Sequence, residues 1–537
     1  MSNLLKVEKL NAALGAGEEN LATIKAAIEK SIEEKYDGIL LPAGEYEVYN
    51  QRAVDMFKDM LCGKISPLDY DRLYSGELRN VMFELDNLNN YSFVGQNTVF
   101  KFNGLLAPFN VVNCDNITFK GFTVDWIDVP YFTADVVGKE GNVIEIVPHS
   151  NWNIVGGEPV VSIQNVDMKT GAQGGMSLFS DISDIKLENG KYTFTCLEPE
   201  QITVGESLVL RYIYNFAPAI HLFRSKNVSF EEITLKANPG MGIIGQKVHN
   251  VNLKKLVVKP AEGRVMSTNT DATHFINCSG TIHFDDCYFE GMGDDATNVH
   301  GFYHIIQDVV GNRVYTKQTQ PSQDGIPVVF EKGQDINFVT ISTLQPYLTT
   351  EILDAGFDSE RQLDYIVVGD DIAKKVVVGD CAASGTEIAK LIFENSVVKN
   401  IRGRGTLVQT RDSVIRNNHF EGCTGEGVHI CTETGWWEAI ATRNIEVSNN
   451  KFLNCGFGST MYCDAVAVVI STNAPTQTVG VHQGIKIVNN EIIGNNMPVM
   501  VTCAKDVEIT GNTFNCTKEC FVRDSENVVI ENNKNIR

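Results

Sequence analysis

The sequence predicts an all-β protein: a right-handed parallel β-helix with an N-terminal capping helix and two inserted antiparallel β-barrels or sandwiches. Strand-like segments that end in Asn or Gly recur every 21 to 23 residues near both ends of the chain. Two long stretches between them do not follow this period. A short, regular period is typical of stacked coils, in which each repeat covers the core of its neighbour.

The repeating unit is an Asn or Gly followed by alternating apolar and polar residues. Three copies before residue 300 are NVSFEEITL (227–235), NVNLKKLVV (250–258) and GTIHFDDCYFEG (280–291). Five copies follow downstream: SVIRNNHFEGC (413–423), NIEVSNNKFLNC (444–455), GIKIVNNEIIGN (484–495), DVEITGNTFNC (506–516) and NVVIENNKNIR (527–537). Asn490, Asn512 and Asn533 occupy equivalent places, where asparagine can stack its amides and tolerates left-handed corners. A leucine-rich repeat has a similar period, but its L-x-x-L-x-L frame is absent.

Residues 18–33 predict the capping helix. The apolar residues that fall on one helical face are Leu21, Ile24, Ile28 and Ile32. The segment 38–50, GILLPAGEYEVYN, then predicts a first strand and a turn. Such a helix would plug the open end of a β-helix, which otherwise exposes unpaired strand edges and apolar core.

The two interruptions predict inserted domains. Residues 130–213 contain ADVVGKEGNVIEIVP, EPVVSIQNV, KYTFTCL and ESLVLRYIY, and residues 302–382 contain RVYTKQT, IPVVFEK and DYIVVGD. Turn signals between these short strands favour antiparallel sheets, although irregular coils of the β-helix are the alternative. The expected parts are a cap with first coils (1–129), an inserted barrel (130–213), coils with the candidate site (214–301), a second barrel (302–382) and C-terminal coils (383–537).

Composition indicates a globular protein, with 43% hydrophobic residues among 537. No apolar run approaches the ~20 residues of a transmembrane helix. The N-terminus has neither the basic nor the apolar region of a signal peptide. We therefore expect no membrane association, and a cytoplasmic location if the sequence is complete. If a signal peptide was removed, the protein is secreted or periplasmic.

The net charge of −22 argues against nucleic acid and against polyanions such as pectate, although a local basic groove can override it. The thirteen cysteines are scattered without a CxxC pair, which favours buried free thiols. No metal-ligand pattern is present, so no metal and no cofactor are predicted. A homodimer is left open.

The most informative stretch runs from Asp271 to Gly301, DATHFINCSGTIHFDDCYFEGMGDDATNVHG. Asp271 and Asp294 are 23 residues apart, which is one coil. Stacked strands lie about 4.8 Å apart, so equivalent side chains emerge side by side. Asp271, Asp294 and Asp295 are therefore predicted to form one carboxylate cluster on the outside of the β-helix.

Adjacent residues of a straight strand point to opposite faces. Asp294 and Asp295 can both reach a substrate only if the backbone bends, which Gly291 and Gly293 would permit. The second insert begins directly after His300 and is expected to wall the site.

Each aspartate motif alone is typical of a turn, but three carboxylates one coil apart are costly unless one holds its proton. Glycoside hydrolysis requires a carboxylic acid that acts as a proton donor beside a carboxylate that acts as a base. A lateral offset would open the ~6.5–9.5 Å gap that admits a water, which favours inversion. A lyase would need a Lys or Arg base beside Ca²⁺-binding aspartates, and no basic residue is expected in the cluster.

The N-T-D and G-D-D motifs resemble those of inverting polysaccharide hydrolases that include the polygalacturonases, although their G-H-G and R-I-K motifs are absent. The string D-D-A-x-N-x-H-G (294–301), the aspartate one coil earlier and the two inserts are similar to the α-1,3-galactosidases of glycoside hydrolase family 110. The resemblance implies release of terminal galactose from blood-group B and related glycans. It implies that Asp294 is the general acid, and that Asp271 and Asp295 orient and deprotonate water.

A second segment, GEGVHICTETGWWE (425–438), places two tryptophans in a Gly-rich, acidic turn. A tryptophan face can stack on a galactose ring, and carboxylates accept bonds from sugar hydroxyls. The alternative is that both tryptophans plug a corner of the core. His274 is either a structural residue or a substrate contact. The predicted substrate-binding residues are Asn298, His300, Glu426, Glu433, Trp436 and Trp437.

The sequence thus favours an exo-acting, inverting hydrolase of terminal α-1,3-linked galactose. The alternatives are a polygalacturonase-like endo-hydrolase of a plant or microbial polysaccharide, or a lyase. A non-catalytic glycan-binding β-helix of tailspike or adhesin type is the non-enzymatic alternative.

Overall fold

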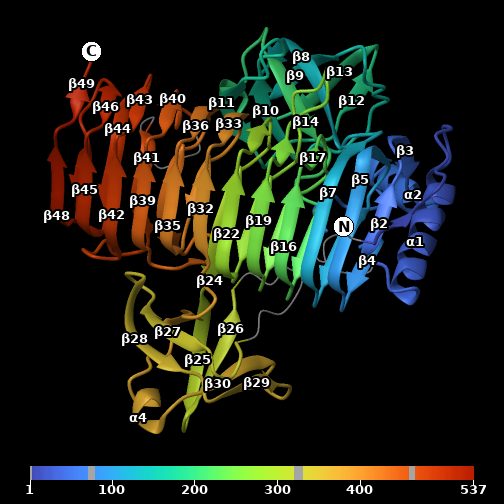
Figure 1. Cartoon of the computed structure of the whole chain (residues 1–537). Helices are drawn as coiled ribbons and strands as arrows, with labels where there is room; N and C mark the ends of the chain where they lie inside the picture. Colours follow the sequence, from blue (N-terminus) through green and yellow to red (C-terminus); the bar gives the residue numbers. More distant parts are fainter. Residues whose placement is uncertain (1–2, 70–78, 320–329, 459–465) are drawn as a thin grey trace.

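The computed structural model describes residues 3–69, 79–319, 330–458 and 466–537. Two long parallel sheets wind around one elongated apolar core (Figure 1). One sheet has 23 strands and runs from β1 (Leu5–Lys6) to β49 (Lys534–Asn535). The other has 12 strands. The expected parallel β-helix is confirmed.

The 12-stranded sheet carries the candidate site. Its strands in spatial order are β4 (Val81–Asp86), β6 (Ala107–Val112), β15 (Ile220–Phe223), β18 (Ile243–Gln246), β21 (Thr273–Ile276), β24 (Thr297–Phe302), β34 (Thr406–Val408), β37 (Val428–Glu433), β41 (Val466–Asn473), β44 (Met497–Thr502) and β47 (Phe521–Arg523). The short β38 (Glu438–Ala439) adds to β24 in antiparallel orientation.

The predicted repeat is the coil of this helix. Val228 pairs with Val251, its equivalent in the next repeat, between the parallel strands β16 (Lys226–Glu231) and β19 (His249–Lys254). Phenylalanine rings stack inside successive coils, with Phe420 and Phe452 at 5.0 Å between ring centroids. The amides of Asn490 and Asn512 are hydrogen-bonded at 3.0 Å, as the stacking prediction requires.

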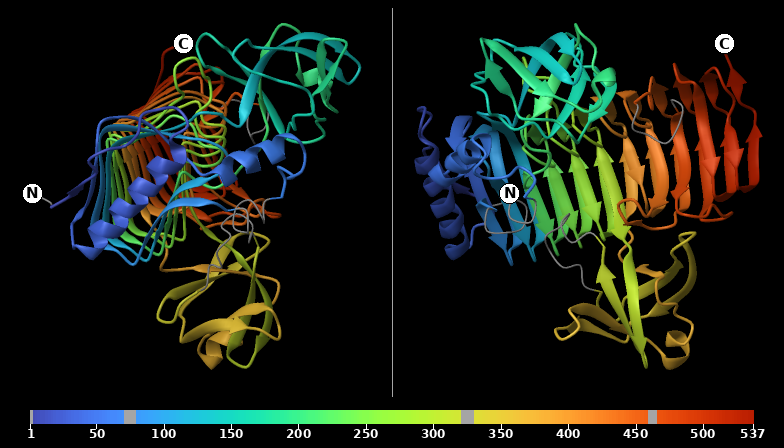
Figure 2. Two further views of the ribbon diagram at one scale, coloured as in Figure 1. Left: turned by 90° about the vertical axis from the view of Figure 1, so that its right-hand side faces the viewer. Right: turned by 180° about the vertical axis from the view of Figure 1, so that it is seen from behind.

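The helix α1 (Gly17–Glu33) lies across the N-terminal end of the coils (Figure 2). Leu21, Ile24 and Ile28 are buried, whereas Ile32 is 44% exposed. The cap also includes α2 (Gln51–Leu61), whose first turn is capped by the side chain of Asn50. The expected capping helix is therefore confirmed.

Two seven-stranded antiparallel sheets interrupt the coils. The first runs from β8 (Tyr131–Glu140) to β14 (Ser207–Arg211), and the second from β25 (His304–Val310) to β31 (Cys381–Ser384), with α4 (Asp370–Ala373) near its end. Figure 1 shows them on different sides of the β-helix. Most of the expected strand IPVVFEK (326–332) lies outside the described residues. Among the described residues, no helix is long and apolar enough to cross a membrane.

Candidate active site

The three predicted aspartates converge at the start of β21 and β24. At least one carboxylate oxygen of each lies within 4.8 Å of the others. The side chains of Asp271 and Asp295 are 6% and 1% exposed, whereas that of Asp294 is 17% exposed. Asp294 is thus the carboxylate most open to a bound molecule.

The register explains this convergence. Thr273 pairs with Thr297, so Asp271 lies opposite Asp295, and the Asp295 amide donates to Asp271 Oδ1 at 3.2 Å. The aspartates therefore lie on adjacent coils with little lateral offset. At least one oxygen of Asp294 also lies within 4.8 Å of both, which is closer than the expected gap of roughly 6.5–9.5 Å between acid and base.

The turn before Asp294 depends on glycine at three positions. Gly291 has a left-handed φ of +73°. A Cβ on Gly293 would meet the Asn269 carbonyl oxygen at 2.1 Å. Gly403, on the next coil, has φ +118°, and its Cβ would meet the carbonyl carbon of Asp294 at 2.6 Å. The backbones of three coils can approach one another only because these residues lack side chains.

Two arginines lie against the carboxylates. Arg404 binds Asp295 through its backbone amide (2.6 Å), Nε (2.9 Å) and Nη2 (2.8 Å). Arg402 Nη1 lies 2.9 Å from Asp294 Oδ2. The expectation that no basic residue lies in the cluster is therefore wrong, because the second insert separates the two arginines from the aspartates in the chain. A guanidinium stays protonated, so neither is suited to act as the base of a lyase.

Besides Arg402, Asp294 contacts a residue at the end of the first insert, not of the second. Tyr214, which follows β14, donates its hydroxyl to Asp294 Oδ2 at 2.7 Å. The Phe179 ring packs edge-on against the Tyr214 ring. The Arg402 guanidinium lies 4.5 Å from the centroid of the Phe179 ring. The second insert was expected to form this wall because it begins close to His300 in the chain.

A chain of hydrogen bonds extends behind Asp271. His274 Nδ1 lies 2.6 Å from Asp271 Oδ2, and His274 Nε2 lies 2.7 Å from His300 Nε2. His300 Nδ1 lies 2.8 Å from the Gly301 carbonyl, which can only accept, so this nitrogen donates. Three contacts need three protons, and two neutral imidazoles supply two. The third is shared between Asp271 and the imidazoles.

Burial has opposite effects on the pKa values of these groups. Burial, followed by the charges of Asp294 and Asp295, raises the pKa of Asp271 well above its usual value. Burial also raises the pKa of Asp295, against the opposing effect of Arg404. It lowers the pKa values of His274 and His300. In each case burial disfavours the charged form of the group.

The remaining predicted residues lie around this centre, mostly buried. Asn298 donates to both Glu438 oxygens at 3.3 Å, and His300 Nε2 lies 3.7 Å from Glu438 Oε1. Glu426 lies one coil beyond Arg404, since the Gly405 amide donates to the Glu426 carbonyl. Glu433 ends β37. As substrate contacts, all of the predicted residues remain predictions.

The two tryptophans differ in their surroundings. Trp436 is 53% exposed, as a sugar-stacking residue requires. Trp437 is partly buried against the cluster that contains Tyr303, and its carbonyl oxygen accepts from the Tyr303 amide at 2.9 Å. Trp437 therefore matches the alternative of a core plug.

Among the residues that the structure describes, two groups bring possible metal-ligand atoms within 4.8 Å of one another: the three aspartates, and His274, His300 and Glu438. Either group could approach one cation geometrically. In both, the polar atoms already bond to protein partners; Arg402 and Arg404, for example, pair with Asp294 and Asp295.

Sequence reasoning missed Tyr214, Arg402, Arg404 and Glu438. The signal that could have located the arginines is RGRG (402–405), one coil beyond Asp295 once the second insert is removed. Tyr214 lies at the return from the first insert, where no repeat indicates its position.

No protein-family model matches the chain. Several curated proteins, however, are similar to it in sequence along most of its length. Alpha-1,3-galactosidase A of Shewanella woodyi is 25% identical over 91% of this chain and 81% of the relative. Alpha-1,3-galactosidase B of Bacteroides thetaiotaomicron is 24% identical over 95% and 87%. Alpha-1,3-galactosidase A of Bacteroides fragilis is 21% identical over 90% and 82%.

The chain is a homologue of the bacterial α-1,3-galactosidases. The resemblance expected from the sequence is confirmed. Among solved structures, the catalytic domain of a GH87 alpha-1,3-glucanase aligns at a TM-score of 0.44, with 9% identity, over 100% of this chain and 66% of its own. An exopolygalacturonase from Thermotoga maritima aligns at 0.41, with 10% identity, over 96% and 87%.

Proposed function

We propose that this homologue of the α-1,3-galactosidases is an exo-acting, inverting glycoside hydrolase that releases terminal α-1,3-linked galactose. Blood-group B type glycans and linear α-galactosyl glycans are its proposed substrates. The main observation behind this proposal is that oxygens of three carboxylates lie within 4.8 Å of one another, beside two arginines. The names of the relatives supply the substrate class.

In the proposed reaction, Asp294 protonates the glycosidic oxygen as the bond from that oxygen to C1 of galactose breaks. Water held by Asp271 and Asp295 attacks C1 from the opposite face, and its proton passes to these carboxylates. The exposure of Asp294 supports its role as acid, since the leaving oxygen must reach it. Proton transfer among the clustered carboxylates then restores the resting state.

The hydrogen bonds of the cluster support a water nucleophile. Arg404 binds both oxygens of Asp295, while the Asp295 amide and His274 bind those of Asp271. Either carboxylate would have to leave these partners to attack C1 itself. One water with two hydrogen bonds of about 2.7 Å can bridge oxygens up to roughly 5.4 Å apart. Oxygens that lie within 4.8 Å of one another can therefore share a bridging water.

The stereochemical test uses galactosyl-α-1,3-galactose, a blood-group B oligosaccharide and polygalacturonate, with the released anomer followed by NMR. We expect β-galactose to appear first from the galactosides. If α-galactose appears first, inversion is wrong. If no galactose is released from either galactoside, the proposed activity is wrong, and release from polygalacturonate would indicate the endo-hydrolase instead.

The role of Asp294 is tested with Asp294→Asn on a glycan and on α-galactosyl fluoride, whose leaving group needs no proton. We expect kcat on the glycan to fall by about 10²–10⁴-fold, and kcat on the fluoride to fall far less. Asp295→Asn should lose activity on both. Asp286→Asn, an exposed position on the same coil, is the control. Equal losses on both substrates for Asp294→Asn would contradict the acid role.

A further inference from the structure

The 12-stranded sheet continues past the aspartates toward the C-terminus, and its outer face has a second polar hollow. This C-terminal pocket has a volume of about 290 Å³ and lies over β37, β41, β44 and β47. Its volume is near the lower limit of the ~300–1,000 Å³ range of small-molecule sites. Two larger hollows in the described part of the chain, of about 660 and 520 Å³, are more open and lie on the other sheet.

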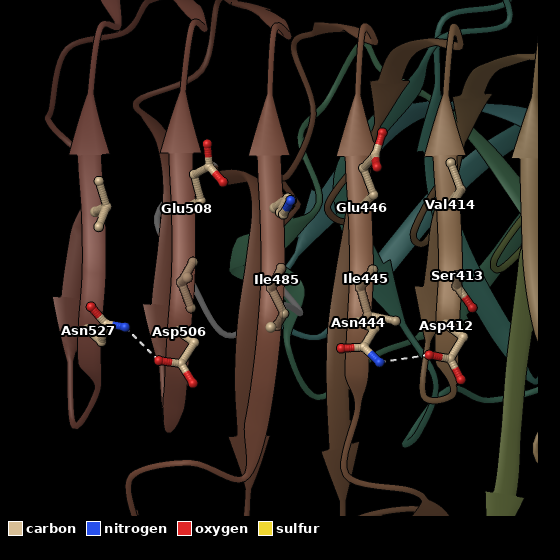
Figure 3. A pocket seen from close by; sticks show the side chains of 14 residues that line it. Asp412, Ser413, Val414, Asn444, Ile445, Glu446, Ile485, Asp506, Glu508 and Asn527 are labelled. Atoms are coloured by element: carbon tan, nitrogen blue, oxygen red, sulfur yellow. Dashed lines mark hydrogen bonds between the residues drawn. The ribbon is translucent and has the colours of Figure 1, made fainter.

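Figure 3 shows the largest of those hollows, about 660 Å³, on the 23-stranded sheet. There, Asn444 donates to Asp412 at 2.8 Å and Asn527 donates to Asp506 at 2.6 Å (Figure 3). These acids are satisfied within the protein, and the hollow does not share a sheet with the catalytic aspartates.

Buried polar side chains on successive coils lie between the active site and the C-terminal pocket. Arg404, which holds Asp295, lies one coil before Glu426. Glu426 Oε2 lies 3.6 Å from His429 Nδ1, and His429 Nε2 lies 2.8 Å from Ser471 Oγ in the pocket. The pocket is thus the next polar surface beyond the catalytic carboxylates.

Strand register places polar side chains in rows along this pocket. Cys431 pairs with Ser471, and Thr502 pairs with Arg523. A parallel row begins with the pair Glu433 and Asn473. Hydroxyl, amide, carboxylate and guanidinium groups together offer donors and acceptors, which match the hydroxyls of a sugar.

The pocket also has an apolar component. Met500 lines it and pairs with Phe521, which is 38% exposed on the neighbouring strand. An apolar surface beside hydrogen-bonding groups suits the C–H face of a pyranose. Glu433 and Arg523 bring opposite charges, so the lining favours a neutral sugar over an anion.

We propose that this pocket binds a neutral sugar residue on the leaving-group side of the substrate, two or more units from the scissile bond. The proposal rests on the proposed function. Three strand steps separate β24 from β41, which is about 14 Å at ~4.8 Å per step. Tyr214 lies beside Asp294 and Phe179 beside Arg402 on the side of the first insert, so the rest of a bound glycan extends along the sheet toward β47.

The test compares kcat/KM for a linear tetrasaccharide with terminal α-1,3-galactose to kcat/KM for an aryl α-galactoside. In Arg523→Ala we expect this ratio to fall roughly ten-fold, since a hydrogen bond from a charged group is lost. Met500→Trp, which fills the pocket, should lower the same ratio. Lys486→Ala, an exposed position on the 23-stranded sheet, is the matched control and should leave it unchanged.

An unchanged ratio in both pocket variants would overturn the pocket assignment while leaving the hydrolase intact. A wild-type protein that is inactive on the aryl α-galactoside and on the tetrasaccharide would overturn the proposed function, and the pocket assignment with it. Equal falls for Lys486→Ala and Arg523→Ala would also overturn the assignment, because the effect would not be specific to the pocket.

Discussion

Asp295 is the most deeply buried of the three carboxylates, and Arg404 satisfies both of its oxygens. A buried charge without a partner is far less stable than a paired one. The pair therefore offsets part of the cost of burying a carboxylate where water is largely excluded. At the scale of single residues, the chemistry of the cluster depends on this pair as much as on the aspartates.

Arg404→Gln should lower the free energy of unfolding by about 3–5 kcal/mol, because Asp295 stays buried without its partner. The double variant with Asp295→Asn should recover part of this loss, since the remaining carboxylate charge is removed. Urea unfolding of both single variants and the double variant measures the coupling. Strict additivity would mean that the two side chains do not stabilise each other.

Among the elements, the C-terminal coils are joined to one another by a ladder of buried asparagines. Asn490 accepts from the backbone and side-chain amides of Asn450, at 2.9 and 3.1 Å, and donates to the Val447 carbonyl at 2.9 Å. Its own backbone amide donates to Asn512 at 2.8 Å. The neighbouring Asn489 is exposed and has a left-handed φ of 58°. One asparagine thus bonds the coils, and the other turns the corner.

Asn490→Ala should cost about 2–4 kcal/mol of unfolding free energy, because several buried groups lose their partners at once. Asn489→Gly should change it by no more than about 0.5 kcal/mol, since glycine adopts the same left-handed corner. Denaturant titration monitored by circular dichroism compares the two. Equal effects would show that the buried ladder adds nothing beyond the corner.

At the scale of the whole molecule, buried ionisable groups oppose one another as pH changes. Burial lowers the pKa of His221 and His482 to about 3 and that of His304 to about 4. Each histidine therefore stabilises the fold above its unfolded pKa of ~6.5, and this contribution is lost as pH falls. The raised pKa of Asp271 acts with the opposite sign, contributing stability at low pH that is lost as pH rises.

The variant His482→Gln tests how much one buried histidine contributes to the pH dependence of the unfolding free energy. The stability advantage of the wild type over this variant should shrink by about 1.4 kcal/mol per pH unit between pH 6.5 and 5, since only the wild type must bury a neutral imidazole. Urea unfolding across this range measures the difference. His249→Gln, at an exposed histidine, should show no such trend. A constant difference for His482→Gln would contradict the burial of an uncharged ring.

The coil and the aspartate motif could be predicted from the sequence alone. The regular spacing of the repeats and their asparagines predict the β-helix, because side-chain alternation and corner geometry are local properties of the chain. The same local reasoning placed Asp271, Asp294 and Asp295 on adjacent coils, where their carboxylate oxygens lie within 4.8 Å of one another.

The partners of those carboxylates and the distances between them could not be predicted from the sequence and are seen only in the folded chain. Arg402 and Arg404 reach the cluster across an insert, and Tyr214 reaches it from the other insert. Such contacts depend on where an insert leaves and rejoins the coil, which no periodic pattern encodes. The register, not the length of the repeat, set Asp271 opposite Asp295, because ladder hydrogen bonds fix which residues of adjacent coils meet.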